Sequence, residues 1–193
     1  MKIFRIHVPH AGNVGVIEVG VEFMPLEIDL YEMIKKGYPL PLSYKIELDE
    51  LSRKRTPSKD FLSFSFSVLA SDKIDPRMRA LLQEYCYSIA MIAPFGNYTY
   101  YLPKTLIDAI DYDRSEVRKY DNDLVISEYD FSNLVLDDSK IGNSPIFQLL
   151  PLNMTGVNYV TEEFVKLYKE CRCKGIRFIP IDTTSELTGS AQR

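Results

Sequence analysis

The chain has 193 residues, a length that favours one domain, and 46% hydrophobic with 26% charged residues is the composition of a folded protein. The net charge of −4 and the pI near 5.3 argue against a nucleic-acid-binding protein, which needs a basic surface. Three cysteines, an odd number, do not make a disulfide framework, and no apolar stretch has the length of a signal peptide or a membrane span. We therefore expect a soluble cytoplasmic protein.

The N-terminal third predicts strands separated by a helix and a loop. Apolar residues at every second position predict a first strand over 2–8, and 14–23 predicts a second one weakened by glycines. A short helix is expected over 29–37, and alternation resumes in a strand within 38–48. The charged, apolar-poor stretch 49–60 predicts an exposed loop.

The stretch 61–69 alternates phenylalanine or aliphatic residues with serine. This period of two predicts one half-buried strand, with an apolar face and a hydroxylated face. The apolar face consists of Leu62, Phe64, Phe66 and Val68.

The middle of the chain predicts one helix and further strands. Helical spacing of apolar residues predicts a helix within 71–86, followed by a hairpin made of 88–95 and 98–103. Residues 116–131 predict a strand, a turn and a second strand, and 145–152 predicts another strand.

The segment 159–181 predicts a complete helix followed by a strand. Thr161 is a suitable N-cap, because its hydroxyl can accept a hydrogen bond from a free amide of the first turn. Gly175 is expected to take the left-handed conformation that ends the helix. Helical spacing predicts one apolar stripe, formed by Phe164, Leu167, Tyr168 and Cys171.

Two of the three cysteines, Cys171 and Cys173, lie two residues apart near the end of this helix. At roughly 100° per residue, the two thiols would differ by about 200° and face opposite ways. They would then be unable to hold a metal jointly or to form a disulfide. We interpret Cys171, like Cys86, as a small core hydrophobe.

These elements predict an α+β fold with mainly antiparallel or mixed sheets, two or three isolated helices, and a C-terminal helix followed by a strand. We expect one domain over 1–182, with a seam at 49–60 that sets off an N-terminal subregion, 1–50. The polar residues 183–193 show no apolar period, so we expect a disordered tail there.

The sequence contains no recognisable catalytic or metal-binding signature. His7 and His10 are the only histidines, and neither the phosphate-binding glycine motifs nor the zinc motif His-Glu-x-x-His is present. We therefore expect neither a cofactor nor a metal ion. The charge is nevertheless asymmetric: residues 108–138 carry a net charge of −7, which leaves +3 for the rest of the chain. Solvated turns between strands would explain these charges equally well.

Three features occur together in one order over 61–181. They are the phenylalanine–serine strand before a short helix, the "IDAID" segment that leads to "YDND", and the ending "VTEEFVKLYKE" followed by "KGIRF". In these features the chain resembles a family of bacterial immunity proteins linked to polymorphic toxin systems. The resemblance implies a cytoplasmic protein of interbacterial competition that binds and neutralises a cognate toxin, and it implies no catalytic residues.

A toxin inhibitor needs a stable scaffold and a complementary surface, and many toxins that act on nucleic acids are basic. We therefore predict that the toxin binds the acidic residues of 108–138 together with the tyrosines among them. The predicted contact residues are Asp108, Asp111, Tyr112, Asp113, Glu116, Tyr120, Asp121, Asp123, Glu128 and Tyr129. We expect no nucleic-acid or membrane partner.

Two other classes of function stay open. The first is a carboxylate-dependent hydrolase that acts on a toxin product or modification, and it requires two convergent carboxylates with displaced pKa values in a pocket. The second is a self-associating protein, because the 12% aromatic residues are compatible with a homodimer interface.

Overall fold

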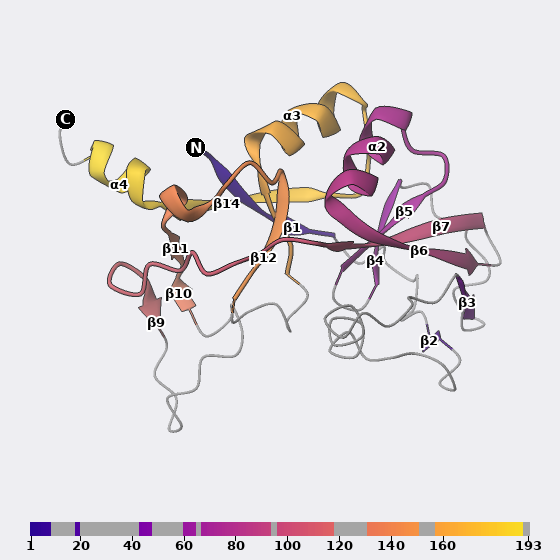
Figure 1. The fold of residues 1–193 in the computed structure, drawn as a ribbon, viewed down its shortest axis with the longest axis horizontal. Coiled ribbons are helices and arrows are strands. Elements are labelled where there is room, and N and C mark those ends of the chain that lie inside the picture. The colour runs from indigo at the N-terminus through magenta and orange to yellow at the C-terminus, as the bar shows by residue number, and fades with distance from the viewer. Residues whose placement is uncertain are drawn as a thin grey trace. The chain divides into compact units, whose positions relative to one another are not determined.

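The computed structural model describes residues 1–8, 18–19, 43–47, 60–64, 67–93, 96–117, 131–150 and 157–190. The chain divides into two compact units (Figure 1). Unit 1 consists of Met1–His7, Pro103–Glu170 and Arg177–Arg193. Unit 2 consists of Val8–Leu102 and Cys171–Ile176. Each unit contains a six-stranded sheet, and the predicted α+β class, with mixed sheets and isolated helices, is confirmed.

In the unit 1 sheet, β1 (Ile3–His7) is a central strand. It pairs antiparallel with β13 (Tyr159–Thr161) on one side and with β14 (Arg177–Thr183) on the other. The order is β11-β14-β1-β13-β12-β8, and the pairs β11–β14 and β12–β8 are parallel. The other strands are β8 (Leu106–Ile107), β11 (Val135–Leu136) and β12 (Ile146–Leu149).

Helix α3 (Glu162–Glu170) covers one face of this sheet (Figure 1). Phe164 and Tyr168 are buried, and each ring makes a T-shaped contact with Phe178 on β14, with centroids 6.3 Å and 5.0 Å apart. Phe4 on β1 packs on the same ring at 6.3 Å. Burial of Phe164 and of Tyr168 stabilises the unit by about 2 kcal/mol each, and the T-shaped geometry adds to this.

A second apolar cluster fills the opposite face of the sheet. Ile3 follows β1's alternation and therefore points away from Phe4. It belongs to a buried cluster with Phe147, Leu149 and Tyr159, in which Phe147 stacks on Tyr159 with centroids 5.9 Å apart. The unit 1 sheet thus has an apolar layer on each face.

The unit 2 sheet has the order β2-β3-β6-β7-β5-β4. Its strands are β2 (Glu18–Val19), β3 (Ser43–Glu47), β4 (Phe61–Phe64), β5 (Ser67–Ser71), β6 (Cys86–Ala93) and β7 (Gly96–Pro103). β6 and β7 are neighbours, as the predicted hairpin requires.

The prediction of one continuous strand over 61–69 is wrong. β4 and β5 pair antiparallel, so the chain reverses direction between Phe64 and Ser67. The register places Phe61 opposite Ala70 and Ser63 opposite Val68. An alternating pattern can continue through a tight hairpin, and no glycine or asparagine marks this reversal.

Helix α2 (Pro76–Tyr85) confirms the helix predicted within 71–86. The Asp75 carboxylate accepts a hydrogen bond from the Arg77 amide at 2.9 Å, and Pro76 occupies the first turn, where no amide is needed. Met78 and Leu82 form its buried face, and Cys86, the first residue of β6, is also buried.

The disordered tail predicted over 183–193 is wrong for its described part. Thr183 ends β14, and Thr184–Ser190 form α4. Polar contacts replace the missing apolar period: the Ser185 hydroxyl donates to Asp138 at 2.6 Å, and the Thr184 hydroxyl donates to the Leu136 carbonyl at 3.1 Å. Residues 191–193 lie outside the described part of the chain.

Several predictions are only partly covered by the described residues. The two ends of 116–131 form an antiparallel pair, β9 (Glu116–Val117) with β10 (Phe131–Asn133). The helix over 29–37 lies outside the described residues, as does the seam 49–60 except Asp60. The single domain over 1–182 stays a prediction, because two compact units do not show whether either folds alone. None of the described helices is both long and apolar enough to cross a bilayer.

The chain leaves α3 differently from the prediction. The helix ends at Glu170, and Arg172, with φ of 52°, takes the left-handed conformation that was expected for Gly175. Gly175 has φ of 114° for another reason: a Cβ there would lie 2.4 Å from the Phe61 carbonyl oxygen. The amides of Asp60 and Phe61 both donate to the Lys174 carbonyl at 3.1 Å, which holds this close approach in place.

We predict that Gly175→Ala destabilises the protein by about 2 kcal/mol or more, because the methyl group meets a fixed backbone oxygen at an unfavourable φ. Urea unfolding measures this loss. Gly142→Ala is the matched control, since a Cβ there meets nothing within 4 Å, and it should change the free energy by less than about 0.5 kcal/mol. Equal effects of the two variants would contradict the close approach.

Candidate functional site

Five of the ten predicted contact residues lie in one segment of unit 1, the acidic turn (residues 108–116), which follows β8 and ends at the first residue of β9. Asp108, Tyr112, Asp113 and Glu116 are exposed, whereas Asp111 is half-buried. The turn has four carboxylates and one arginine, a net charge of −3. The other predicted residues lie outside the described part of the chain: Tyr120, Asp121, Asp123, Glu128 and Tyr129.

Asp111 fixes the conformation of the acidic turn. Its Oδ2 lies 2.6 Å from the Arg114 Nη1, and its Oδ1 accepts the Arg114 amide at 3.1 Å. Its own amide donates to the Val135 carbonyl at 3.0 Å. The hydrogen bond from the Arg114 side chain lowers the pKa of Asp111. Because this charge is matched within the turn, Asp111 is less suited to a partner than the sequence suggests.

Tyr112 is the exposed aromatic residue of the turn. Its side chain is 49% exposed, and one side of its ring packs at 6.3 Å on Phe131. Partial burial, followed by the negative charge of Asp108, raises the pKa of Tyr112, so the phenol keeps its proton at neutral pH. A supported ring with a polar tip is a common interface anchor, because little side-chain entropy is lost when a partner covers it.

Three carboxylates of the turn are exposed to an incoming group. Within the described residues, Asp108 and Asp113 have no ion pair, and the Glu116 carboxylate accepts a hydrogen bond from the Ser132 hydroxyl at 3.2 Å. Their fields act over about 8 Å at physiological salt. A hydrolase would instead need convergent carboxylates in a pocket, and the described carboxylates of the acidic turn do not have that arrangement.

The sequence predicted that the thiols of Cys171 and Cys173 face opposite ways because both would lie on a helix. This geometric basis is wrong. Both follow the end of α3 and are half-buried, and Cys171, Cys173 and Cys86 are all free thiols. Burial, with the negative charge of Asp60 as the next cause, raises the pKa of Cys173 to about 11. Burial also raises the pKa of Cys171. Neither is therefore a thiolate nucleophile at neutral pH.

The histidines supply no described metal site. His7 lies exposed at the end of β1, and His10 falls outside the described residues. Where the structure describes the chain, no group of three or more His, Cys, Asp or Glu residues is placed to hold a metal ion.

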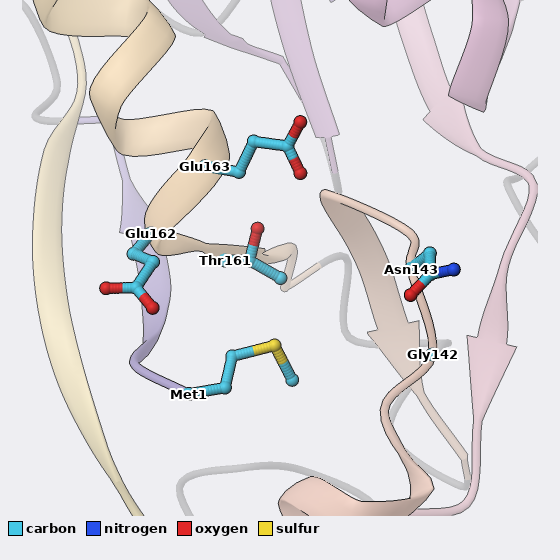
Figure 2. Close-up of a pocket in the computed structure, with 6 residues that line it drawn as sticks. All are labelled: Met1, Gly142, Asn143, Thr161, Glu162 and Glu163. Carbon is cyan, nitrogen blue, oxygen red and sulfur yellow. The ribbon is translucent and has the colours of Figure 1, made fainter.

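The sequence did not predict a pocket at the start of α3. Its volume is about 260 Å³, and we name it the α3 pocket (Figure 2). The residues that line it are Met1, Gly142, Asn143, Thr161, Glu162 and Glu163. All belong to unit 1. The backbone at its base is held, because the Thr161 amide donates to the Pro145 carbonyl and the Glu162 amide to the Lys2 carbonyl, both at 3.1 Å.

Thr161 does not cap α3 as its position suggests. The residue directly precedes the helix, and only 5% of it is exposed. Its hydroxyl oxygen has no hydrogen-bond partner among the described residues, and Thr183 on β14 is in the same situation. A buried hydroxyl without a partner costs about 1 to 3 kcal/mol. The Thr-Glu-Glu sequence identified a helix start but could not reveal an unused hydroxyl beside a pocket.

We predict that Thr161→Val and Thr183→Val each stabilise the protein, by about 1 kcal/mol, because valine keeps the shape of threonine, favours a strand and removes the unpaired hydroxyl. Chemical unfolding of the two variants measures the gain. A loss of 1 kcal/mol or more in either variant would show that its hydroxyl has a hydrogen-bond partner.

We also predict slow alkylation of Cys173. With a pKa near 11, its thiolate fraction at pH 8 is smaller than that of an ordinary cysteine, and iodoacetamide should react on the order of tenfold to a hundredfold more slowly. The rate should rise with pH up to about 11. Site-resolved mass spectrometry follows the reaction, with the unfolded chain as control, and equal rates in the two states at pH 8 would contradict the raised pKa.

No protein-family model and no curated protein matches this chain. The geometry of unit 1 therefore supplies the main structural argument about function.

Proposed function

We propose that this chain is an immunity protein that binds a cognate bacterial toxin in the cytoplasm and neutralises it by direct contact. The observation that carries the proposal is the acidic turn, in which Tyr112 stands exposed beside the outward carboxylates of Asp108 and Asp113. The resemblance of 61–181 to immunity proteins supports the same function and gives the class of partner.

The electrostatics of the turn suit an inhibitor. A concentrated negative charge accelerates encounter with a basic toxin and disfavours acidic proteins. The Asp111–Arg114 ion pair and the hydrogen bond from the Asp111 amide to the Val135 carbonyl fix the conformation of the turn in the free protein. A preformed surface loses less conformational entropy on binding, so more of the interaction energy appears as affinity.

Inhibition by direct contact also requires a minimum area of the protein–protein interface. A stable protein interface buries about 800 Å² on each partner, which needs about 20 to 30 residues. The nine residues of the acidic turn are too few for this, so the interface extends onto neighbouring surface of the chain. The turn then acts as the part that steers and anchors the toxin, with Tyr112 as the candidate hot spot.

We predict that Asp108→Lys/Asp113→Lys lowers the association rate with the toxin about tenfold or more at low salt, because steering depends on charge near the contact. The toxin domain is identified from the adjacent open reading frame and by co-purification, and surface plasmon resonance at several salt concentrations measures the rates. The difference from wild type should shrink as salt rises.

The matched control is Asp72→Lys/Glu170→Lys, which changes the net charge by the same amount at two exposed positions outside the acidic turn. It should keep most of the wild-type association rate. Asp111 is left unchanged in both variants, because its loss would disturb the turn itself. If both double variants associate as fast as wild type, the acidic turn is not the binding surface. If the chain neither binds the toxin nor rescues cells from it, the proposed function is wrong.

A further inference from the structure

We infer that Cys171 and Cys173 are a redox pair: they form a disulfide with each other in the folded protein, and this bond loosens the start of α2. Both cysteines lie in the segment Cys171–Ile176, which belongs to unit 2, as α2 does. The inference does not rest on the proposed function, because the acidic turn lies in unit 1.

The two thiols converge on one residue, Asp75. The Cys171 thiol donates a hydrogen bond to the Asp75 carboxylate, and the Cys173 sulfur accepts one from the Asp75 amide. The amide and the carboxylate of one aspartate are only a few covalent bonds apart, so both sulfurs lie on the same side of the chain. The left-handed Arg172 between them, with φ of 52°, turns the backbone out of the helical path that would separate the thiols.

The spacing of the two cysteines permits a disulfide. Residues two positions apart have Cα atoms at most about 7 Å apart, and disulfides join Cα atoms at about 4.4 to 6.8 Å. Because Cys171 and Arg172 form a turn, the pair is closer than in an extended chain. Both cysteines are free and half-buried, so a small reagent can reach them, whereas Cys86 is buried.

The Cys171 sulfur is also part of the cap of α2. The first amides of a helix have no partner within the helix. Here the Arg77 amide donates to the Asp75 carboxylate at 2.9 Å, and the Met78 amide donates to the Cys171 sulfur. A disulfide removes the hydrogen that Cys171 donates to Asp75 and draws its sulfur towards Cys173, so the capping contacts weaken.

The residue after the pair is fixed, which confines the distortion to the turn. The Lys174 amide donates to the Asp60 carboxylate at 2.7 Å, and the Lys174 carbonyl accepts the amides of Asp60 and Phe61 at 3.1 Å. The segment therefore does not move as a whole when the ring closes. The change falls on Cys171 and Cys173 and on the α2 cap that they contact.

Cys171 is the thiol that reacts first. Burial raises the pKa of both thiols, and the negative charge of Asp60 adds to the rise at Cys173. At Cys171 the positive charge of Arg77 and the Met78 amide act in the opposite direction. The thiolate fraction of both is small at neutral pH, so oxidation is slow there and accelerates as the pH rises.

The oxidant is a low-molecular-weight disulfide such as oxidised glutathione. The Cys171 thiolate attacks one of its sulfurs, which forms a mixed disulfide and releases one glutathione thiolate that takes up a proton. The Cys173 thiolate then attacks the Cys171 sulfur, closes the protein disulfide and releases the second glutathione in the same way. The protein loses two electrons and two protons, and one disulfide becomes two thiols.

The first test measures whether the thiols converge. Phenylarsine oxide binds two neighbouring thiols through two As–S bonds and releases water. Native mass spectrometry should show one arsenical on the folded wild-type chain and on Cys86→Ala, and none on Cys171→Ser or Cys173→Ser. Binding by the wild-type chain only after unfolding in urea would overturn the inference.

The second test follows oxidation of the full chain by oxidised glutathione at about pH 9, with peptide mass spectrometry. We expect the Cys171–Cys173 disulfide in the wild-type chain and a stable glutathione adduct on Cys171 in Cys173→Ser. Urea below the unfolding transition should change the rate by less than about twofold, because the folded protein reacts. A rate that rises in step with the unfolded fraction would contradict the proposed pair.

Hydrogen exchange, measured by NMR, tests the effect on α2. After oxidation the amides of Arg77 and Met78 should exchange about tenfold faster or more, whereas the Ile6 amide, bonded to the Asn158 carbonyl in unit 1, should keep its rate. Cys171→Ser/Cys173→Ser, treated in the same way, is the matched control and should show no change. Complete disulfide formation without faster exchange at the two α2 amides would overturn the second part of the inference.

Discussion

The double pairing of β1 is the interaction on which unit 1 depends. Residues 3–5 pair on one side with 159–161, and residues 3–7 pair on the other with 177–181, so a loop of more than 150 residues closes before either ladder can form. The entropy cost of such a loop grows only with the logarithm of its length, and it is offset by two backbone ladders and by apolar burial on both faces. The α3 pocket is a direct consequence, because the first residues of the chain meet the start of α3 only through this pairing.

Local signals in the sequence predicted α2 and α3. The stripe of Phe164, Leu167 and Tyr168 identified α3, and Met78 with Leu82 identified the buried face of α2. Partners between strands could not be predicted in the same way, because alternation shows that a strand has two faces but not which distant strand lies beside it. The stretch 61–69 shows a second limit: its period of two runs through a reversal of the chain, and the pattern therefore resembles one strand.

The candidate site was predicted from charge and from the tyrosines among the acidic residues, without any geometry. Asp108, Tyr112 and Asp113 lie exposed in one turn, as a binding surface requires, but composition could not distinguish them from Asp111, whose carboxylate is matched by Arg114. The predicted geometry of Cys171 and Cys173 was wrong for a related reason. Helical geometry was extended through Cys171 to Cys173, whereas a left-handed Arg172 ends the helix, and a non-glycine residue in that conformation leaves no sequence signal.

The acidic turn and the α3 pocket share one physical property. In each, backbone hydrogen bonds fix the segment that carries the exposed carboxylates. The Asp111 amide donates to the Val135 carbonyl in the turn, and the Thr161 amide donates to the Pro145 carbonyl at the start of α3. The stability of the sheet therefore keeps these exposed carboxylates in place. Thr161 marks where this arrangement has a cost, because its buried hydroxyl has no hydrogen-bond partner among the described residues.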